Sequence, residues 1–434
     1  MDAETKNNKK PVSKGNDKIP PADKYLWAIY ILLCVMSIVE HYSAASSVVS
    51  STNIIGPLMK QCFHLGTGFI IVYFVQRIPY NKFVYGIPVF ALLSIILAIL
   101  VLLVGTERNN ALRSINLGFM ELQSAEFVKF SAISMLALVL SFTQLKDKKG
   151  ISNAGMWVSI LVVLVFSGLL ITQGLTNTIL LVSICVSLMI IGGMQIKKLG
   201  IVFLVFILLG GGYFGIKILA APKKANVENV AEKTGTIDRV TQVFLPRIKR
   251  KFGGEDSIQK WDRKITRYNR QEQYSYFAQA NGGPFGVGLG NSRESARLSL
   301  AFSDYIYAII VEEAGLLGGI FVLIVYLALL GRAAAIASQC NIAFPMLLVL
   351  GMALYITFQA LFHMAIVSGV FPVSGQPLPF ISAGGTSIWV SSLAIGVMLS
   401  VSRFATRKKS DTKDKKKEVS ALPEDFSAEN PSLL

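Results

Sequence analysis

Asp304 is the residue whose type and position best suit it to chemistry. It stands alone where a long polar segment meets a hydrophobic run. Apolar neighbours partly desolvate a carboxylate and raise its pKa, which suits it to act as a general base. The alternative is a helix cap, because Ser303 and Asp304 are both residue types favoured at a helix start. Glu312 and Glu313 lie about 12 Å further along a helix, too far to form a paired-carboxylate glycosidase site with Asp304.

Glu126 and Lys129 are charged residues within an otherwise apolar run. Ionisable groups inside a membrane-spanning segment are costly unless they are paired, so each one is a candidate functional residue. Three residues apart on a helix, the two side chains share a face and can neutralise each other. A structural ion pair and a functional site are equally open interpretations of this pair.

Two segments rich in glycine or proline are candidates for binding. The segment Phe371–Ser387 holds three prolines, three glycines and no charge. Its turns and backbone amides could cradle an anionic or sugar group, or form a packed re-entrant turn. The segment Gly282–Gly290 allows close approach of its backbone to a neighbour, but it lacks the spacing of a dinucleotide-binding motif. The three histidines and four single cysteines show no metal-ligand spacing, so the metal-binding residues are unknown.

The composition indicates that membrane-spanning helices position these residues. Hydrophobic residues make up 53% of the 434-residue chain and charged residues 16%, which excludes a water-soluble protein. A spanning helix needs about 20 mainly apolar residues. We therefore predict an all-α polytopic membrane protein with about ten transmembrane helices, at residues 25–48, 61–76, 83–104, 124–144, 154–172, 175–195, 199–219, 304–330, 343–368 and 386–404.

The distribution of positive charge predicts the orientation of these helices. With a cytoplasmic N-terminus, eight Lys and Arg residues lie in inner loops and three in short outer loops. We therefore predict a cytoplasmic tail at residues 1–24, a membrane domain at 25–404 and a second cytoplasmic tail at 405–434. The net charge of +16 follows from this topology and does not indicate a nucleic-acid partner.

A large extracytoplasmic loop, residues 220–303, is predicted between the seventh and eighth helices. It carries fifteen basic and eight acidic residues. Such a surface favours a substrate with phosphate, and nonspecific attraction to lipid headgroups is the alternative. Within the loop, Trp261–Gln279 is aromatic and amphipathic, which predicts a helix along the membrane interface.

Several stretches, in order along the chain, resemble the SEDS family of FtsW, RodA and SpoVE. They are YSA from Tyr42, QSAEFVK from Gln123, GGPFGVGLGNS from Gly282, SDYIYAIIVEEAGLLGG from Ser303 and PVSGQPLPFISAGGTS from Pro372. The resemblance covers nearly all of residues 24–404 and includes the ten-helix plan with its large outer loop. The polar tails look more like those of the division members than those of the elongation members.

The resemblance implies a set of site residues. Asp304 falls on the family's catalytic aspartate. Arg293 and Arg297 lie in the stretch where the family has a basic residue. The remaining implied substrate-binding residues are Arg113, Glu126, Lys129, Pro372, Gly375, Pro379, Ser382, Gly384, Gly385 and Ser387.

The chain also departs from the family pattern at four places. Ser114 replaces the tryptophan after the loop arginine, Ala125 replaces the proline before the glutamate, and Ala383 replaces a tyrosine. The segment Gln173–Asn177, with Gly174 in it, lacks the carboxylate that many relatives carry there. Because of these changes, the reaction rate, the metal dependence and the orientation of the substrate do not follow directly from the resemblance.

The resemblance implies a peptidoglycan glycosyltransferase that polymerises lipid II into β-1,4 glycan strands. The implied partners are a class B penicillin-binding protein, other division proteins and membrane lipids, and the implied location is the bacterial cytoplasmic membrane at the division septum. No cofactor is certain, and a divalent cation bridged by Asp304 is an open alternative. Two rival functions remain: a flippase for a lipid-linked sugar and a noncatalytic division scaffold.

Overall fold

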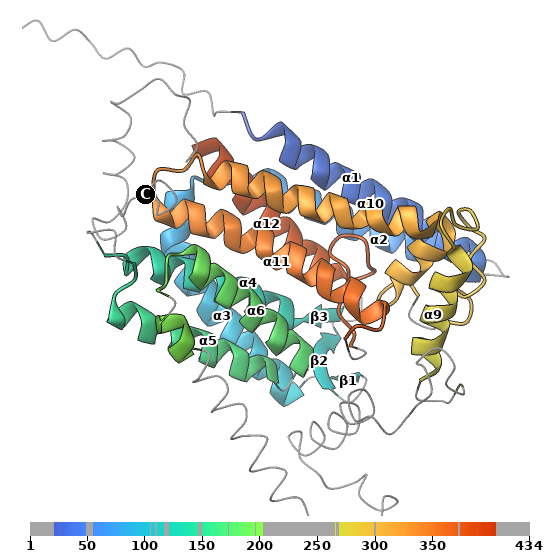
Figure 1. Ribbon diagram of the computed structural model, residues 1–434, viewed down its shortest axis with the longest axis horizontal. Coiled ribbons are helices and arrows are strands. Elements are labelled where there is room, and N and C mark those ends of the chain that lie inside the picture. The colour runs from blue at the N-terminus through green and yellow to red at the C-terminus, as the bar shows by residue number, and fades with distance from the viewer. Residues whose placement is uncertain are drawn as a thin grey trace, which may run out of the picture.

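The fold is a bundle of long helices with a small sheet at one end (Figure 1). The computed structural model describes residues 21–48, 55–104, 106–108, 111–116, 121–145, 150–171, 173–195, 197–202, 265, 269–298, 301–371 and 374–404. Most of the predicted N-terminal tail, the predicted C-terminal tail and most of the predicted outer loop lie outside these ranges. The helices that position the site are α1 (Lys24–Val48), α2 (Ile55–Val75), η1 (Tyr80–Lys82), α3 (Phe83–Val104), α4 (Ser124–Phe142), α5 (Asn153–Ile171), α6 (Leu175–Ile191), α9 (Arg270–Gly282), α10 (Ile306–Ala337), α11 (Ala343–Val367) and α12 (Gly385–Phe404).

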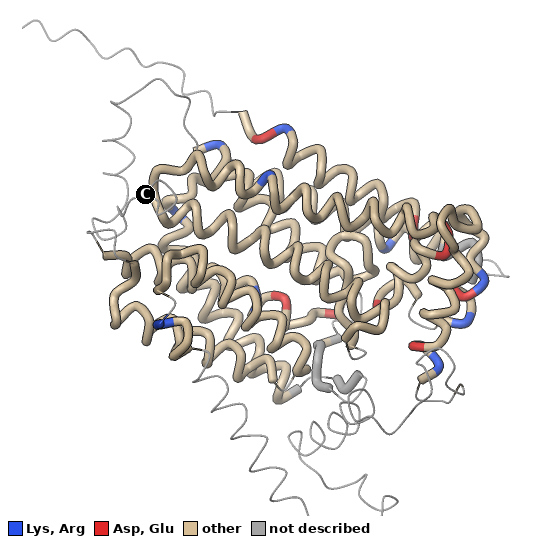
Figure 2. The backbone as a smooth tube through the Cα atoms, viewed as in Figure 1, with Lys and Arg blue, Asp and Glu red and all other residues tan. Residues whose placement is uncertain are grey.

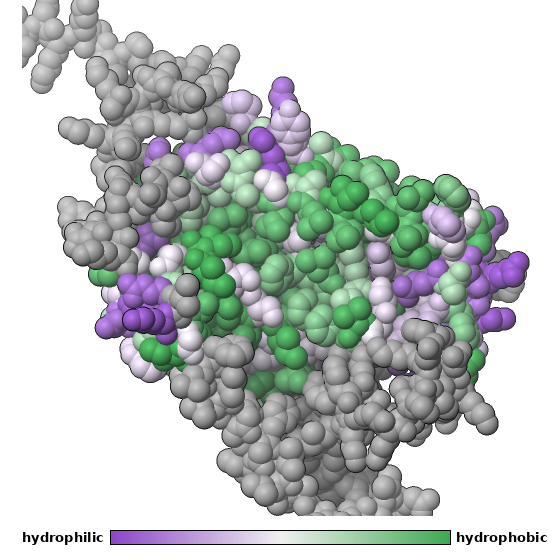
Figure 3. All heavy atoms as spheres, viewed as in Figure 1, coloured by the Kyte–Doolittle hydropathy of each residue, from purple (hydrophilic) through white to green (hydrophobic). Residues whose placement is uncertain are grey.

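The helices confirm the prediction of a polytopic membrane protein. Within the described ranges, eight helices are long and apolar enough to cross a membrane, and α6 is a shorter apolar helix. On the face that Figure 3 shows, hydrophobic residues cover the middle of the molecule, and hydrophilic residues lie toward both ends. Most of the charged residues in Figure 2 also lie toward the two ends, and a few lie in the middle of the bundle. The predicted span at 199–219 lies mostly outside the described residues.

Three helices form the centre of the bundle. Most residues of α4, α11 and α12 are buried, whereas fewer than half of the residues of α1, α2 and α3 are buried. The helix α11 packs against both α4 and α10, and α12 packs against α2. The candidate site residues on α4, α11 and α12 are therefore held by the most enclosed part of the fold. We call the two ends of the helix bundle the Asp304 end, which lies near α9, and the Asp23 end.

A three-stranded antiparallel sheet is the main departure from the predicted all-α fold. Its strands are β1 (Thr106–Arg108), β2 (Ala111–Asn116) and β3 (Glu121–Gln123), in the order β1-β2-β3. Strand pairing satisfies the backbone groups of a connection that is too polar to span a membrane. The Thr386 hydroxyl at the start of α12 donates to the Glu121 carbonyl at 2.9 Å, which fixes the sheet to the bundle.

The helix α9 packs against protein, and its expected position along the membrane interface stays a prediction. Its buried residues include Gln273, Ser275 and Ala278. The Ser275 hydroxyl donates to the Val367 carbonyl at the end of α11 at 2.9 Å. Small and polar residues thus form the buried face, whereas the prediction rested on the aromatic residues.

The helix α10 is broken at Gly315, a feature that was not predicted. Gly315 has a φ of +72°, which favours glycine. The segment 282–290 satisfies the backbone groups freed by the break. The Val287 and Gly288 amides donate to the carbonyls of Glu312 and Glu313 at 3.0 and 2.9 Å. The break thus divides α10 into a short part, 306–314, and a long part that begins at residue 316.

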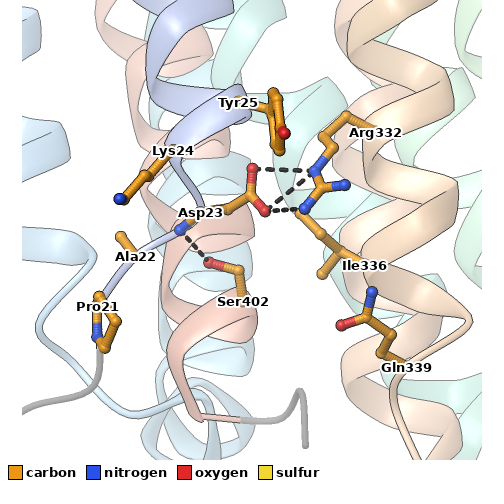
Figure 4. A pocket seen from close by; sticks show the side chains of 9 residues that line it. All are labelled: Pro21, Ala22, Asp23, Lys24, Tyr25, Arg332, Ile336, Gln339 and Ser402. Carbon is orange, nitrogen blue, oxygen red and sulfur yellow. Dashed lines mark hydrogen bonds and ion pairs between the residues drawn. The ribbon is translucent and has the colours of Figure 1, made fainter. Parts of the chain in front are cut away.

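A cavity of about 290 Å³ lies at the Asp23 end, where α1, α10 and α12 meet (Figure 4). The Arg332 Nε lies 3.0 Å from both carboxylate oxygens of Asp23. The Asp23 amide donates to the Ser402 hydroxyl at 3.3 Å. One aspartate thus joins the three helices at this end.

We expect Asp23→Asn to lower the stability of this end by about 1 kcal/mol, the scale of a partly exposed ion pair. Burial raises the pKa of Asp23, but the hydrogen bond and charge of Arg332 outweigh burial and hold the pKa below its usual value. The stabilisation is therefore present above the unfolded pKa of about 3.9 and is lost as the pH falls through the folded pKa. Thermal unfolding in detergent at several pH values measures this difference.

The exposed Lys24 supplies the control for this prediction. Lys24→Gln should unfold like the wild type at every pH. A difference between Asp23→Asn and the wild type that stays constant below pH 4 would contradict the role of the ionised pair.

Candidate active site at the Asp304 end

Asp304 lies in the turn that leads into α10, and its side chain is half-buried. Tyr305 and Ile306 directly after it are buried. The N-cap residue of α10 is Tyr305, and no side-chain hydrogen bond forms the cap. Asp304 is therefore not the N-cap residue, and the two residues that follow it are buried apolar ones.

The segment 382–385 lies directly against the turn that carries Asp304. The Ser382 hydroxyl donates to the Ser303 carbonyl at 2.7 Å, and the Ala383 amide donates to the Phe302 carbonyl at 2.8 Å. Gly384 and Gly385 follow directly, and both residues are only half-buried. The structure thus ties the predicted serine to the turn that carries the candidate base, and the two predicted glycines follow it closely in the chain.

The preceding residues form a packed turn within the bundle. Pro379 is buried, and its carbonyl accepts a hydrogen bond from the Tyr326 hydroxyl. Phe380 has a φ of +66°, and its ring centroid lies 5.4 Å from that of Tyr30 on α1. The Gln61 amide on α2 donates to the Phe380 carbonyl at 3.4 Å. Within Phe371–Ser387, the residues around Pro379 and Phe380 therefore form the packed turn, and residues 383–385 are the more exposed part of the segment.

Glu126 and Lys129 form the ion pair that their spacing predicts. The Lys129 Nζ lies 2.8 Å from the Glu126 Oε1, and both side chains are buried. The Tyr355 hydroxyl on α11 donates to the Glu126 Oε2 at 2.5 Å. The Lys129 Nζ also donates to the Gln359 Oε1 at 3.1 Å. This network supports a structural role, and a direct contact with substrate stays a prediction.

The same network reaches the packed turn. The Gln359 Nε2 lies 3.4 Å from the Pro377 carbonyl and 3.5 Å from the Ser387 hydroxyl. The Gln376 amide donates to the Asn177 Oδ1 at 2.9 Å, and the Gln376 carbonyl lies 2.6 Å from a ring nitrogen of His363. The amide of Asn177 thus makes a neutral contact in the segment where many relatives carry a carboxylate.

Arg113 lies on β2, the middle strand of the sheet. Its side chain is outside the described part of the structure. Ser114, the next residue, pairs with Gln123 of β3, and the Gln123 amide donates to the Thr386 hydroxyl at 3.2 Å. The strand of Arg113 is therefore tied to the beginning of α12, next to residues 383–385.

Arg293 and Arg297 are exposed on a turn before Asp304. The Arg297 guanidinium lies 3.1 Å from the Glu294 carboxylate. Burial raises the pKa of Glu294, and the charge of Arg297 opposes that effect. No residue in the described ranges pairs with the Arg293 guanidinium. Arg293 is thus the cation of this turn that is open to an anionic ligand.

The predicted residues fall into two groups in space. Asp304, Ser382 and the two glycines after it are brought together by the contacts above, whereas Glu126, Lys129 and Ser387 lie in the buried network. Gly375 is half-buried before the packed turn, and Pro372 lies outside the described residues. Whether each one binds substrate stays a prediction.

The contacts of Ser43, Glu312 and Glu313 were not predicted from the sequence. The Ser43 hydroxyl, in the YSA stretch, donates to the Glu313 carboxylate. From the sequence, Glu312 stands out only as a carboxylate that is too distant to form a paired site with Asp304. The sequence signal for these contacts is a pair of acidic residues shortly before a glycine inside an apolar run. Buried carboxylates need hydrogen-bond donors, so such a pair predicts a polar segment packed against it.

Metal binding has no obvious set of ligands in the described part of the chain. No three His, Cys, Asp or Glu side chains there lie close enough to hold an ion together. A divalent cation at Asp304 stays an open alternative.

The fold and these contacts define a multi-pass membrane protein with a carboxylate beside a packed turn at one end of its bundle. The family model FTSW_RODA_SPOVE, described as "Cell cycle protein", matches residues 23–407. The chain therefore belongs to this family.

Named relatives extend over most of the chain. The "Probable peptidoglycan glycosyltransferase FtsW" of Coxiella burnetii is 28% identical over 386 residues, covering 86% of this chain and 95% of the relative. The "Stage V sporulation protein E" of Bacillus subtilis is 29% identical over 392 residues, covering 88% and 97%.

Solved structures share the fold. The rod shape determining protein RodA of Thermus thermophilus has a TM-score of 0.59 at 20% identity, covering 89% of this chain and 98% of that chain. A chain of a peptidoglycan synthase complex has a TM-score of 0.63 at 20% identity, covering 88% and 98%. The expected family and fold class are thus confirmed.

Proposed function

We propose that this member of the family is a peptidoglycan glycosyltransferase that polymerises lipid II into β-1,4 glycan strands during cell division. The observation that carries the proposal is Asp304, a half-buried carboxylate fixed beside residues 382–385 by the bond from Ser382 to the Ser303 carbonyl. The names of several relatives as probable peptidoglycan glycosyltransferases support the same activity.

The proposed reaction joins an acceptor sugar hydroxyl to a donor sugar that is linked through a diphosphate to a polyprenol. Asp304 takes the proton of the GlcNAc 4-hydroxyl as the oxygen attacks the anomeric carbon. The bond from that carbon to the diphosphate breaks with inversion, which gives the β-linked product. Diphosphate is a good leaving group, so the protein must mainly supply orientation, the base and positive charge. Arg113 and Arg293 are the proposed partners of the departing diphosphate.

The orientation that we propose places both termini in the cytoplasm and Asp304 on the outer side. Basic residues at the Asp23 end support it, because positive charge favours the cytoplasmic side. They include Lys24, Arg77, Lys82, Arg332 and Arg403, which flank the ends of the helices there. The proposed location is the bacterial cytoplasmic membrane at the division septum.

The proposed partner is a class B penicillin-binding protein, which would cross-link the glycan strands. Its support is the likeness to a chain from a peptidoglycan synthase complex. Other division proteins and membrane lipids are further proposed partners. We propose no resident cofactor, and chelation tests the alternative of a divalent cation.

Polymerisation of lipid II by purified protein tests the proposed function. The protein is incubated with lipid II, with and without a class B penicillin-binding protein and with and without chelator. Glycan ladders on a gel are the expected result. Movement of lipid II across vesicles without any ladder would favour a flippase. Ladders that require the partner and persist when Asp304 is changed would favour a scaffold.

A further inference from the structure

Two adjacent buried carboxylates, Glu312 and Glu313, end the short part of α10. Neither has a role in the reaction proposed above. Burying a charged group is costly unless hydrogen bonds or opposite charges compensate for it. The partners of these carboxylates therefore indicate what they hold in place.

Glu312 is fully buried and accepts hydrogen bonds from one turn of the segment before Asp304. The Ser292 hydroxyl donates to its carboxylate at 2.5 Å, the Arg293 amide at 3.2 Å and the Glu294 amide at 3.4 Å. The side-chain amide of Asn281, at the end of α9, lies 3.5 Å from the Glu312 carboxylate. Three of these donors are consecutive residues, so the carboxylate fixes the backbone on which Arg293 stands.

Ser292 extends this anchor into the turn. Its hydroxyl donates to Glu312 and also accepts a hydrogen bond from the Ser295 amide at 3.1 Å. The Leu298 amide donates to the Glu294 carbonyl at 3.0 Å. The turn 292–298 is therefore organised by its own hydrogen bonds, with Glu312 at its beginning.

Apolar packing joins this turn to the turn that carries Asp304. Leu298 and Ala301 belong to one buried cluster with Tyr305 and Ala308. Ala278 of α9 and Val367 of α11 complete the cluster on the other side. This cluster holds the end of the turn, at Leu298, against the beginning of α10.

Glu313 holds the preceding part of the segment through α1. Its carboxylate accepts a hydrogen bond from the Ser43 hydroxyl, which accepts one from the Gly290 amide at 2.6 Å. A Cβ on Gly286 would lie 2.1 Å from the Glu313 carbonyl, so the backbone fits closely there. Glu313 therefore anchors residues 286–290 and also bonds the Ser292 backbone, whereas Glu312 accepts the amides of Arg293 and Glu294.

We propose that Glu312 is a positioning residue that holds the Arg293 guanidinium at the Asp304 end, where it binds the diphosphate of the donor. This inference rests on the proposed function. Glu312 acts through Ser292 and the amides of Arg293 and Glu294, and it does not touch the substrate. Its negative charge suits three donors that point at one carboxylate. Glutamine has the same shape, but its NH₂ group would face some of these donors.

We expect Glu312→Gln to raise the KM for lipid II about tenfold, because hydrogen bonds to a charged group are each worth more than 1 kcal/mol. The kcat should change by less than about threefold, since separate hydrogen bonds from Ser382 and Ala383 hold the turn that carries Asp304. Glu272→Gln on α9 is the matched control and should behave like the wild type, because Glu272 contacts the Tyr276 hydroxyl and not the turn.

A double-mutant cycle with Arg293→Ala distinguishes positioning from a general structural effect. Arg293→Ala should raise the KM by a similar factor, and Glu312→Gln should add little to it, since both changes remove the same interaction. A fall in kcat at unchanged KM would overturn the proposal, and so would effects of the two substitutions that multiply.

Trypsin cleavage provides a readout that does not depend on activity. Arg293 and Arg297 are exposed, so cleavage after them reports the order of the turn. Glu312→Gln should speed cleavage at both sites, Ser292→Ala should do so to a smaller degree, and Glu272→Gln should not. Ser292→Ala also serves if Glu312→Gln fails to fold. Unchanged cleavage in both variants overturns the inference even if the wild type makes glycan. Faster cleavage without any glycan from the wild type instead supports the anchoring and overturns the proposed function.

Discussion

Asp304→Asn should lower the rate of lipid II polymerisation by about 10²- to 10⁴-fold, the usual contribution of a general base. Asparagine keeps the size of the side chain but cannot take the proton of the acceptor hydroxyl. The side chain is half-buried and lies outside the buried cores, so folding should be little affected. Gel analysis of glycan products, with the initial rate measured over a range of lipid II concentrations, gives the loss in kcat.

The matched control for this prediction is Glu272→Gln, another carboxylate on the same side of the bundle. It should keep wild-type activity, and size exclusion in detergent should show both variants folded. Normal polymerisation by Asp304→Asn would contradict the assignment of the base, even if the chain remained a glycosyltransferase. Activity of the wild type that is lost with chelator would add the divalent cation to the site.

The sequence predicts the helices well because the bilayer imposes a simple requirement. Each span needs about 20 apolar residues, and the run from Phe83 to Val104 has the length that one span requires. The pair of Glu126 and Lys129 is predictable for the same local reason, since residues three apart share a helix face. Both predictions concern neighbours along the chain.

Contacts between distant segments are harder to predict. The approach of Ser382 to Ser303 joins residues 79 positions apart, and periodicity contains no information about it. Only the family resemblance placed the two segments in one site. The break of α10 is a similar case, because a single glycine inside an apolar helix is usually tolerated at a cost of about 1 kcal/mol. At Gly315 the segment 282–290 decides the outcome by supplying hydrogen bonds to the freed groups.

Lys129→Met should lower the free energy of unfolding by about 3 to 5 kcal/mol, the cost of leaving one member of a buried ion pair alone. Methionine fills much of the same volume, so the loss comes from the charge that remains on Glu126. The Tyr355 hydroxyl and the Gln359 amide still donate to that carboxylate, but they do not neutralise it. Unfolding in detergent, followed by circular dichroism, measures the loss.

The double variant Glu126→Gln with Lys129→Met separates the two interpretations of this pair. It removes both charges, so most of the lost stability should return, because a neutral replacement of a buried ion pair is often close to the original in stability. If the pair is structural, polymerisation returns together with stability, since the introduced amide oxygen can still accept the hydrogen bond from the Tyr355 hydroxyl. If stability returns and polymerisation does not, Lys129 acts on the substrate, and the buried network must open during the reaction. A Lys129→Met variant as stable as the wild type would mean that water reaches the pair and would contradict its burial.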